Sequence, residues 1–206
     1  MLLLFPGEAP VSYAPPDAAA FIERVAADPC CAAITAEEGL DEALESRAPV
    51  IFILRGNGLT LGHFVRRIHD ADKLVAVHVD LVGGLRADRA SIDWLSGAGV
   101  DAVISSHGQL MPAIRHGGMT AIHRLLLVRR SQLDTAVAAI GRSAPHIVEI
   151  LPGVILPSVV AMMPRFDVPV LAGGFVRTAA DVQAILAAGA LGVTTSTHEL
   201  WGSARA

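Results

Sequence analysis

Two stretches decide the fold of this chain: Val168-Pro-Val-Leu-Ala-Gly-Gly-Phe175 and Gly192-Val-Thr-Thr-Ser-Thr-His-Glu-Leu-Trp201. Each begins as a short apolar run, typical of a buried strand, and ends in glycines or hydroxyl side chains. A segment with helical spacing, residues 179–188, joins them. A (β/α)8 barrel builds an anion site in this order, from the loops that follow its seventh and eighth strands. The two stretches therefore predict the end of such a barrel and an anion cradle above it.

The helix between the two stretches carries its own boundary signals. Thr178, followed three residues later by Asp181, predicts an N-terminal capping box, and Gly189 stands where a helix ends in a left-handed residue. The same spacing recurs at Ser196 and Glu199. We therefore expect Ser196 to cap a short terminal helix whose backbone N–H groups point toward the anion.

Eight short apolar runs along the chain are expected to be strands: residues 32–34, 50–54, 75–81, 102–105, 121–124, 147–151, 168–172 and 191–194. Segments with helical periodicity separate them, at residues 38–46, 61–71, 88–98, 109–116, 132–142, 156–165 and 179–188. Such alternation predicts parallel pairing, and eight units close a barrel without a free edge. The fold class is thus α/β, as a single small (β/α)8 barrel of the TIM type over residues 32–206. A doubly wound open sheet is the alternative, although no Gly-rich turn follows the first strand.

Residues 1–31 are expected to form an N-terminal extension, a Pro-rich arm followed by a helix that begins near Asp17 and lies against the outside or the lower end of the barrel. The 206 residues are 52% hydrophobic, with a mean hydropathy of +0.51, which suits one domain with a sizeable core. No apolar run approaches the roughly 18 residues of a membrane span, and the first residues do not read as a signal peptide. We therefore expect a cytoplasmic protein.

Polar side chains at the expected strand ends are the candidates for ligand binding. His78 and Asp80 share one strand face, and the alternative is that they are a hydrogen-bonded core histidine and a turn cap. Glu149 is costly to bury alone, so it should meet a ligand hydroxyl, a cation or Arg124. His107 either contacts a ligand or caps the next helix. No HExxH, CxxC or tight histidine cluster accompanies them, so neither a metal nor a cofactor is expected.

Basic residues gather at Arg66 and Arg67 and at Arg129 and Arg130. Arginine suits bidentate phosphate contacts, so these pairs are candidate RNA contacts, and solvated helix faces are the alternative. The formal net charge of −4 and the pI near 6.0 confine any RNA site to a local patch. Cys30 and Cys31 are adjacent and are expected to act as small apolar residues.

Six motifs follow one another between residues 77 and 201: Val77-His-Val-Asp-Leu-Val-Gly-Gly-Leu85, Asp101-Ala-Val-Ile-Ser-Ser106, His123-Arg-Leu-Leu-Leu-Val128, Val148-Glu-Ile-Leu-Pro-Gly153, Ala172-Gly-Gly174 and Thr195-Ser-Thr-His-Glu-Leu-Trp201. In their order and gaps they resemble the glycerol-3-phosphate-responsive antiterminator family of bacteria. The resemblance implies a barrel that senses glycerol 3-phosphate and acts on leader mRNA of glycerol-utilisation genes to prevent premature termination. It implies that the phosphate is held by Gly173, Gly174, Thr195 and Ser196, and that the glycerol is faced by His78, Asp80, Arg124 and Glu149.

The chain departs from the family pattern at three strand ends. His107 stands where the family has the lysine of Ser-Thr-Lys, Arg129 and Arg130 replace the last two residues of Ile-Asp-Ser, and Asn57 replaces the aspartate of Gly-Asp. These changes leave the phosphate cradle intact and alter the rest of the ligand site.

Two other functions stay open at this point. The fold also hosts isomerases, lyases and aldolases of small phosphorylated substrates, with Glu149 or Asp80 as the base. A phospho-ligand binding protein without RNA activity is the third hypothesis. The sequence leaves open whether the chain forms a homo-oligomer.

Overall fold

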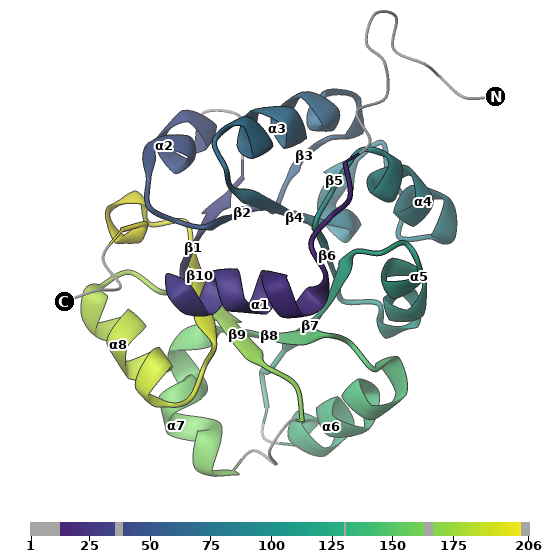
Figure 1. Cartoon of the computed structure of the whole chain (residues 1–206). Coiled ribbons are helices and arrows are strands. Elements are labelled where there is room, and N and C mark those ends of the chain that lie inside the picture. The colour runs from purple at the N-terminus through teal and green to yellow at the C-terminus, as the bar shows by residue number, and fades with distance from the viewer. Residues whose placement is uncertain (1–12, 36–38, 130, 163–166, 203–206) are drawn as a thin grey trace, which may run out of the picture.

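Eight short strands form a closed parallel barrel in the computed structural model, which describes residues 13–35, 39–129, 131–162 and 167–202 (Figure 1). The strands are β1 (Cys30–Ile34), β2 (Val50–Ile53), β4 (Leu74–His78), β6 (Ala102–Ser105), β7 (Thr120–Leu126), β8 (Ile147–Leu151), β9 (Val170–Gly173) and β10 (Gly192–Thr195). They pair in the order β1-β10-β9-β8-β7-β6-β4-β2, and β2 returns to β1. The predicted (β/α)8 barrel is confirmed, and the open sheet is excluded.

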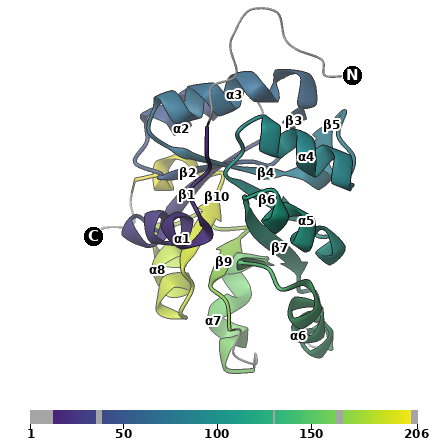
Figure 2. The ribbon, with the colours of Figure 1, turned by 45° about the vertical axis from the view of Figure 1, so that its right-hand side comes forward.

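Helices surround the barrel as an outer ring (Figures 1 and 2). They are α2 (Leu40–Glu45), α3 (Gly58–Asp70), α4 (Arg89–Gly97), α5 (Met111–His116), α6 (Gln132–Ser143), α7 (Leu156–Val159) and α8 (Ala179–Ala187). The predicted capping box of α8 is present, since Thr178 and Asp181 each bond the other's backbone N–H, and Gly189 follows with φ +94°. The helix expected at residues 156–165 is shorter: α7 passes into a 3₁₀ turn, Val160–Met162, and residues 163–166 lie outside the described part. None of the helices in the described ranges has the length and apolar character that crossing a bilayer requires.

Helix α1 (Ala18–Ala27) closes the amino end of the barrel, lying across it in Figure 1. Asp17 begins the helix by accepting a hydrogen bond from the backbone N–H of Ala20. Phe21 and Val25 are fully buried and pack on the first inward-facing residues of the strands. The N-terminal extension thus supplies the floor of the barrel core, and β1 begins at Cys30, two residues before the expected boundary.

Asp101 anchors the chain segment that precedes α1. It is fully buried, and its Oδ2 accepts the backbone N–H of Val75 at 2.7 Å and lies 3.0 Å from His69 Nε2. The hydroxyl of Tyr13 donates to Asp101, and the Tyr13 ring stacks on His69 with centroids 4.0 Å apart. This network explains why a polar residue opens the second family motif, at the amino end of β6.

The barrel interior is filled by apolar side chains at alternate strand positions. They include Cys31, Ala33, Val50, Phe52, Ala76, Ile104, Ile122 and Leu171. Burial raises the pKa of the Cys30 thiol to about 12 and that of Cys31 well above its usual range, so both cysteines stay protonated and act as apolar residues. Above this packed core, the carboxyl ends of the strands carry the polar residues.

A second, two-stranded sheet was not predicted. The loops after β2 and β4 pair as β3 (Gly56–Asn57) and β5 (Val82–Gly83). The side chain of Asn57 accepts a hydrogen bond from the backbone N–H of Leu59 and caps α3. The family departure at Asn57 therefore has a local structural role beside the carboxyl end of the barrel.

Candidate functional site

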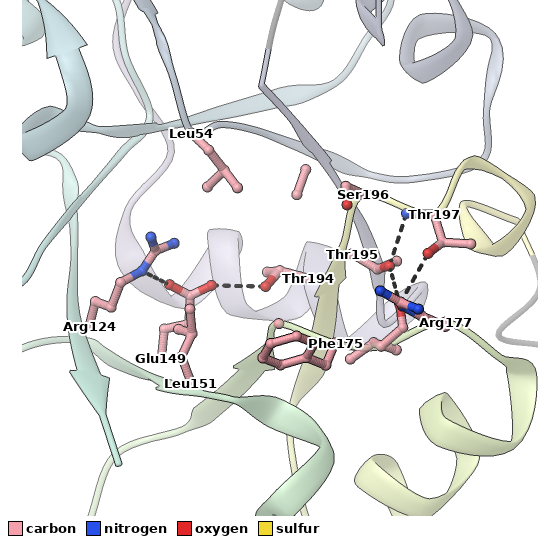
Figure 3. A pocket seen from close by; sticks show the side chains of 13 residues that line it. Leu54, Arg124, Glu149, Leu151, Phe175, Arg177, Thr194, Thr195, Ser196 and Thr197 are labelled. Atoms are coloured by element: carbon pink, nitrogen blue, oxygen red, sulfur yellow. Dashed lines mark hydrogen bonds and ion pairs between the residues drawn. The ribbon is translucent and has the colours of Figure 1, made fainter. Parts of the chain in front are cut away.

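An open pocket of about 300 Å³ lies at the carboxyl end of the barrel, which we call the mouth (Figure 3). Strand ends of β1, β2, β7, β8, β9 and β10 supply its lining: Ala33, Leu54, Arg124, Glu149, Leu151, Gly174, Phe175, Val176, Arg177, Thr194, Thr195, Ser196 and Thr197. Five of the eight predicted ligand residues are among them. His78, Asp80 and Gly173 are not.

A buried ion pair forms one side of the pocket. Glu149 is 1% exposed, and its Oε2 accepts from Arg124 Nε at 2.7 Å while its Oε1 accepts from Thr194 Oγ1 at 2.8 Å. The ion pair that the sequence left open is therefore formed, and a third strand supports it. Because both carboxylate oxygens are engaged, Glu149 holds Arg124 in place, and Figure 3 shows the terminal nitrogens of Arg124 on the Leu54 side of this pair.

Gly173 stands beside this ion pair for a steric reason. A Cβ added at Gly173 would overlap Thr194 Oγ1 and lie 3.1 Å from Glu149 Oε1. The absence of a side chain therefore allows the bond between Thr194 and Glu149. The structure places Gly173 behind the pocket, as a spacer for its polar residues.

Asp80 and His78 lie next to the pocket and do not line it. Asp80 accepts from Ser105 Oγ at 2.5 Å and from the backbone N–H of Ser106 at 2.7 Å, so it holds the loop after β6. His78 is 3% exposed, with Nε2 3.9 Å from Asp80 Oδ2, and neither ring nitrogen has a hydrogen-bond partner within the described ranges. Burial, reinforced by the positive charge of Arg124, lowers the pKa of His78 to about 4. A neutral imidazole thus lies beneath the mouth.

The opposite side of the pocket is built from the loops after β9 and β10. Gly174 has φ +85°, a left-handed conformation that turns the chain sharply at the end of β9. The hydroxyls of Thr195 and Thr197 both donate to the carbonyl of Val176, at 2.9 and 3.1 Å. These bonds tie the two loops together, and Ser196 lines the pocket between the two threonines. The pair of loops that the sequence predicted as an anion cradle is thus assembled in one place.

The predicted cap at Ser196 is wrong. Residues His198–Leu200 form a single 3₁₀ turn that follows Thr197 and has no side-chain cap. The indole of Trp201 donates to the carbonyl of Thr195 at 2.7 Å and stacks on His198 with centroids 4.3 Å apart. This anchor fixes a tight turn directly after β10, so the described residues that follow β10 form a 3₁₀ turn in place of the expected helix.

Arg177 lines the pocket and was missed in the sequence. Its side chain is exposed, and its backbone N–H donates to the carboxylate of Asp181 at 3.0 Å, the same group that caps α8. The sequence feature that could have identified Arg177 is its position four residues after Gly173, in the loop of the predicted cradle. Arg177 supplies an exposed positive charge on one side of the pocket, and Arg124, although paired with Glu149, lines another side, which suits an anionic ligand.

The predicted basic pairs do not form one surface. Arg67 is on α3 and pairs with Asp41 at 2.5 Å, whereas Arg129 is exposed and follows β7 near the start of α6. Figure 2 shows α3 and α6 on opposite sides of the barrel. Arg66 shares α3 with Arg67, and Arg130 lies outside the described residues.

The other residues considered for chemistry give no metal centre. His107 is exposed, and its backbone N–H donates to Ser105 Oγ at 3.0 Å. No three His, Cys, Asp or Glu side chains come close enough to hold a metal ion in the part of the chain that the structure describes.

Fold and pocket together define a small parallel (β/α)8 barrel with a pocket at its carboxyl end that two arginines, hydroxyl side chains and apolar residues line. The family model described as glycerol-3-phosphate responsive antiterminator matches residues 30–201, and the chain belongs to that family. YgcP of Escherichia coli is 29% identical over 180 residues, which covers 86% of this chain and 94% of YgcP.

Solved structures of glycerol uptake operon antiterminator proteins are similar to this one. The regulatory protein from Listeria monocytogenes is 31% identical with a TM-score of 0.79, over 84% of this chain and 95% of that one. A related protein from Thermotoga maritima is 25% identical with a TM-score of 0.75, over 84% of this chain and 97% of that one. An aldolase, QR15, shares the fold at 12% identity, with a TM-score of 0.65 over 84% of this chain and 92% of that one.

Proposed function

We propose that this protein senses glycerol 3-phosphate in the cytoplasm and, in response, acts on leader mRNA of glycerol-utilisation genes to prevent premature termination. The observation that carries the proposal is the pocket that Arg124 and Arg177 line, in a chain of the glycerol-3-phosphate responsive antiterminator family. Its volume of about 300 Å³ is at the small end of ligand sites, which suits a ligand of this size.

The phosphate would lie on the side of the pocket formed by the loops after β9 and β10. Arg177 would supply a charged contact, and Gly174, Thr195 and Ser196 would supply backbone N–H or hydroxyl donors. Two bonds to the Val176 carbonyl already fix the loops, so little conformational entropy is lost on binding.

The glycerol moiety would extend toward Arg124. Glu149 and Asp80 each have both carboxylate oxygens engaged, so they position Arg124 and the loop after β6. Arg124 retains terminal N–H donors for a ligand hydroxyl, and His78 lies beneath with two unpartnered ring nitrogens within the described ranges. Of the four residues predicted to face the glycerol, we therefore favour Arg124 and His78 as contacts.

The same engaged carboxylates are why we prefer a sensor over an enzyme. Neither Glu149 nor Asp80 is a free base, because each accepts two hydrogen bonds. The single lysine of the chain, Lys73, precedes β4 at the amino end, where its Nζ donates to the carbonyls of Ser46 and Ala48 at 2.6 and 2.7 Å. A Schiff base at the mouth would have no lysine to form it.

Transcription in vitro through the leader of a glycerol-utilisation operon tests the proposal. Protein with glycerol 3-phosphate should increase read-through of the leader terminator, and protein alone, or with glycerol or inorganic phosphate, should do so less. Read-through that never responds to glycerol 3-phosphate would refute the regulatory function. Turnover of a triose phosphate that is lost in Glu149→Gln would favour the enzyme instead.

A further inference from the structure

Three apolar side chains stand exposed on one side of the mouth. Leu126, Val128 and Phe175 are 63%, 67% and 72% exposed. Leu126 pairs in register with Leu151, and Leu151 and Phe175 line the same pocket. The ends of β7, β8 and β9 are neighbours in the barrel, so these apolar residues lie along one arc of the mouth, which we call the rim. Figure 3 shows Phe175 and Leu151 on the side of the pocket opposite Leu54.

Two exposed arginines lie next to the rim. Arg129 follows β7 and Arg177 follows β9, and the carboxylate of Asp181, the first after β9, accepts from the backbone N–H groups of Arg177 and Thr178. The chain as a whole has a formal net charge of −4. The two arginines place positive charge beside the apolar rim of an acidic protein, which suits contact with the phosphates of a nucleic acid.

Phe175 is held in a conformation that proteins usually avoid for a large side chain. Its φ is +59°, in the left-handed region, at a cost of roughly 1–2 kcal/mol for a residue with a Cβ. Burial does not compensate, because the ring is 72% exposed. A strained, exposed aromatic ring beside a ligand pocket suggests a binding partner for that ring.

We propose that the rim binds single-stranded RNA, with a base stacked on Phe175 and the RNA backbone on Arg129. Aromatic rings with arginines beside them are what single-stranded RNA binds, because bases stack on the ring and phosphates pair with guanidinium groups. This inference rests on the proposed function and adds the surface that reads the RNA. It selects Arg129 of the predicted basic residues and sets aside the pair on α3.

A second copy of the chain fits the rim less well. In a twofold dimer each rim would face its own copy, so Arg129 and Arg177 of the two chains would be brought together. The three side chains expose on the order of a few hundred Å², below the roughly 1,000 Å² that a stable protein interface buries.

Ligand and RNA would be coupled through Phe175, which belongs to both sites. A ligand in the pocket contacts the loop that carries the ring, and so favours one position of Phe175. Because such coupling is reciprocal, glycerol 3-phosphate should change the affinity for RNA by the same factor as RNA changes the affinity for glycerol 3-phosphate.

The test is fluorescence anisotropy at low ionic strength. One probe is a labelled single-stranded RNA of mixed sequence, longer than the roughly 4–16 nucleotides that such a site covers, and the other is the same RNA as a duplex. Phe175→Leu should weaken binding of the single strand by about 5- to 150-fold, and Phe175→Trp should retain it. Arg129→Gln should lower the slope of log affinity against log salt by about 0.7. Arg142→Gln in the last turn of α6 removes an exposed arginine elsewhere and is the matched control for Arg129→Gln, and Trp94→Leu on α4, at a residue that is 37% exposed, is the control for loss of an aromatic ring.

Unchanged RNA affinity in both Phe175→Leu and Arg129→Gln would overturn the inference. A second result would also overturn it. If sedimentation shows self-association that Phe175→Leu preserves and Phe175→Asp abolishes, while both variants bind RNA as the wild type does, the rim is a protein interface. Titration calorimetry with glycerol 3-phosphate separates the two proposals. A wild-type protein that binds glycerol 3-phosphate and no RNA refutes the rim site and leaves ligand sensing, whereas RNA binding without glycerol 3-phosphate binding refutes the sensor and leaves the rim.

Discussion

Replacing Gly173 by alanine should destabilise the barrel by about 2–4 kcal/mol. The added Cβ would overlap Thr194 Oγ1, and threonine can relieve the overlap only by rotating its hydroxyl away from Glu149. The lost hydrogen bond to a buried carboxylate is worth roughly 1.5–3 kcal/mol, and an off-rotamer side chain adds about 0.5–1.5 kcal/mol. Because Glu149 also holds Arg124, the affinity for ligand should fall with the stability.

Urea unfolding, followed by circular dichroism, measures the effect. With a slope near 2 kcal/mol per M, the midpoint of Gly173→Ala should fall by about 1–2 M. Gly141→Ala is the control, because Gly141 lies in helix α6 with no atom within 4 Å of the added Cβ. That variant should be as stable as the wild type or more so, since alanine favours a helix over glycine. A loss below about 0.5 kcal/mol for Gly173→Ala would refute the packing argument.

Two further predictions concern His78 and Trp201. His78 has a folded-state pKa of about 4 against an ordinary 6.5, so between these values the unfolded chain takes up a proton that the folded chain excludes. The contribution of His78 to the free energy of unfolding should therefore be fully present above pH 6.5 and should be lost as the pH drops toward 4, by on the order of 3 kcal/mol in all. The wild type should lose more stability over that window than His78→Gln, and parallel pH profiles would contradict the buried neutral imidazole. Trp201→Phe should lower stability by about 1–2 kcal/mol, because the indole no longer donates to the Thr195 carbonyl, and an unchanged urea midpoint would show that the stacking on His198 suffices.

The barrel could be predicted from sequence because its signals are local. Each strand is a short apolar run closed by glycine, proline or a polar residue, and a boundary such as the capping box of Thr178 and Asp181 needs only neighbouring residues. The existence of α1 followed from the spacing of Phe21 and Val25, which gives the helix one apolar face, but the sequence left open whether it lies against the outside or the lower end of the barrel.

The details of the site depend on contacts across the barrel, which sequence spacing does not give. Arg124 and Glu149 pair because β7 and β8 place them in register, and Thr194 reaches Glu149 only because Gly173 has no side chain. The cap expected at Ser196 failed for a similar reason, since the anchor of Trp201 on Thr195 overrides a local pattern.

Apart from its position in the loop of the predicted cradle, Arg177 has no sequence pattern that separates a ligand contact from a solvated side chain. Its place in the pocket depends on how the loops after β9 and β10 come together. Asp80 and Glu149 illustrate the opposite case, because their carboxylates looked available in sequence and are engaged by hydrogen bonds in the structure.

Titration calorimetry of glycerol 3-phosphate into the wild type and into Arg177→Gln tests most directly whether the mouth is a glycerol 3-phosphate site. The wild type should bind glycerol 3-phosphate more tightly than inorganic phosphate or glycerol, and Arg177→Gln should weaken it by about 10- to 150-fold, the value of a charge-assisted hydrogen bond. Arg142→Gln, the same change in the last turn of α6, should bind as the wild type does. No heat, no thermal shift and no competition with phosphate at millimolar glycerol 3-phosphate would contradict the assignment.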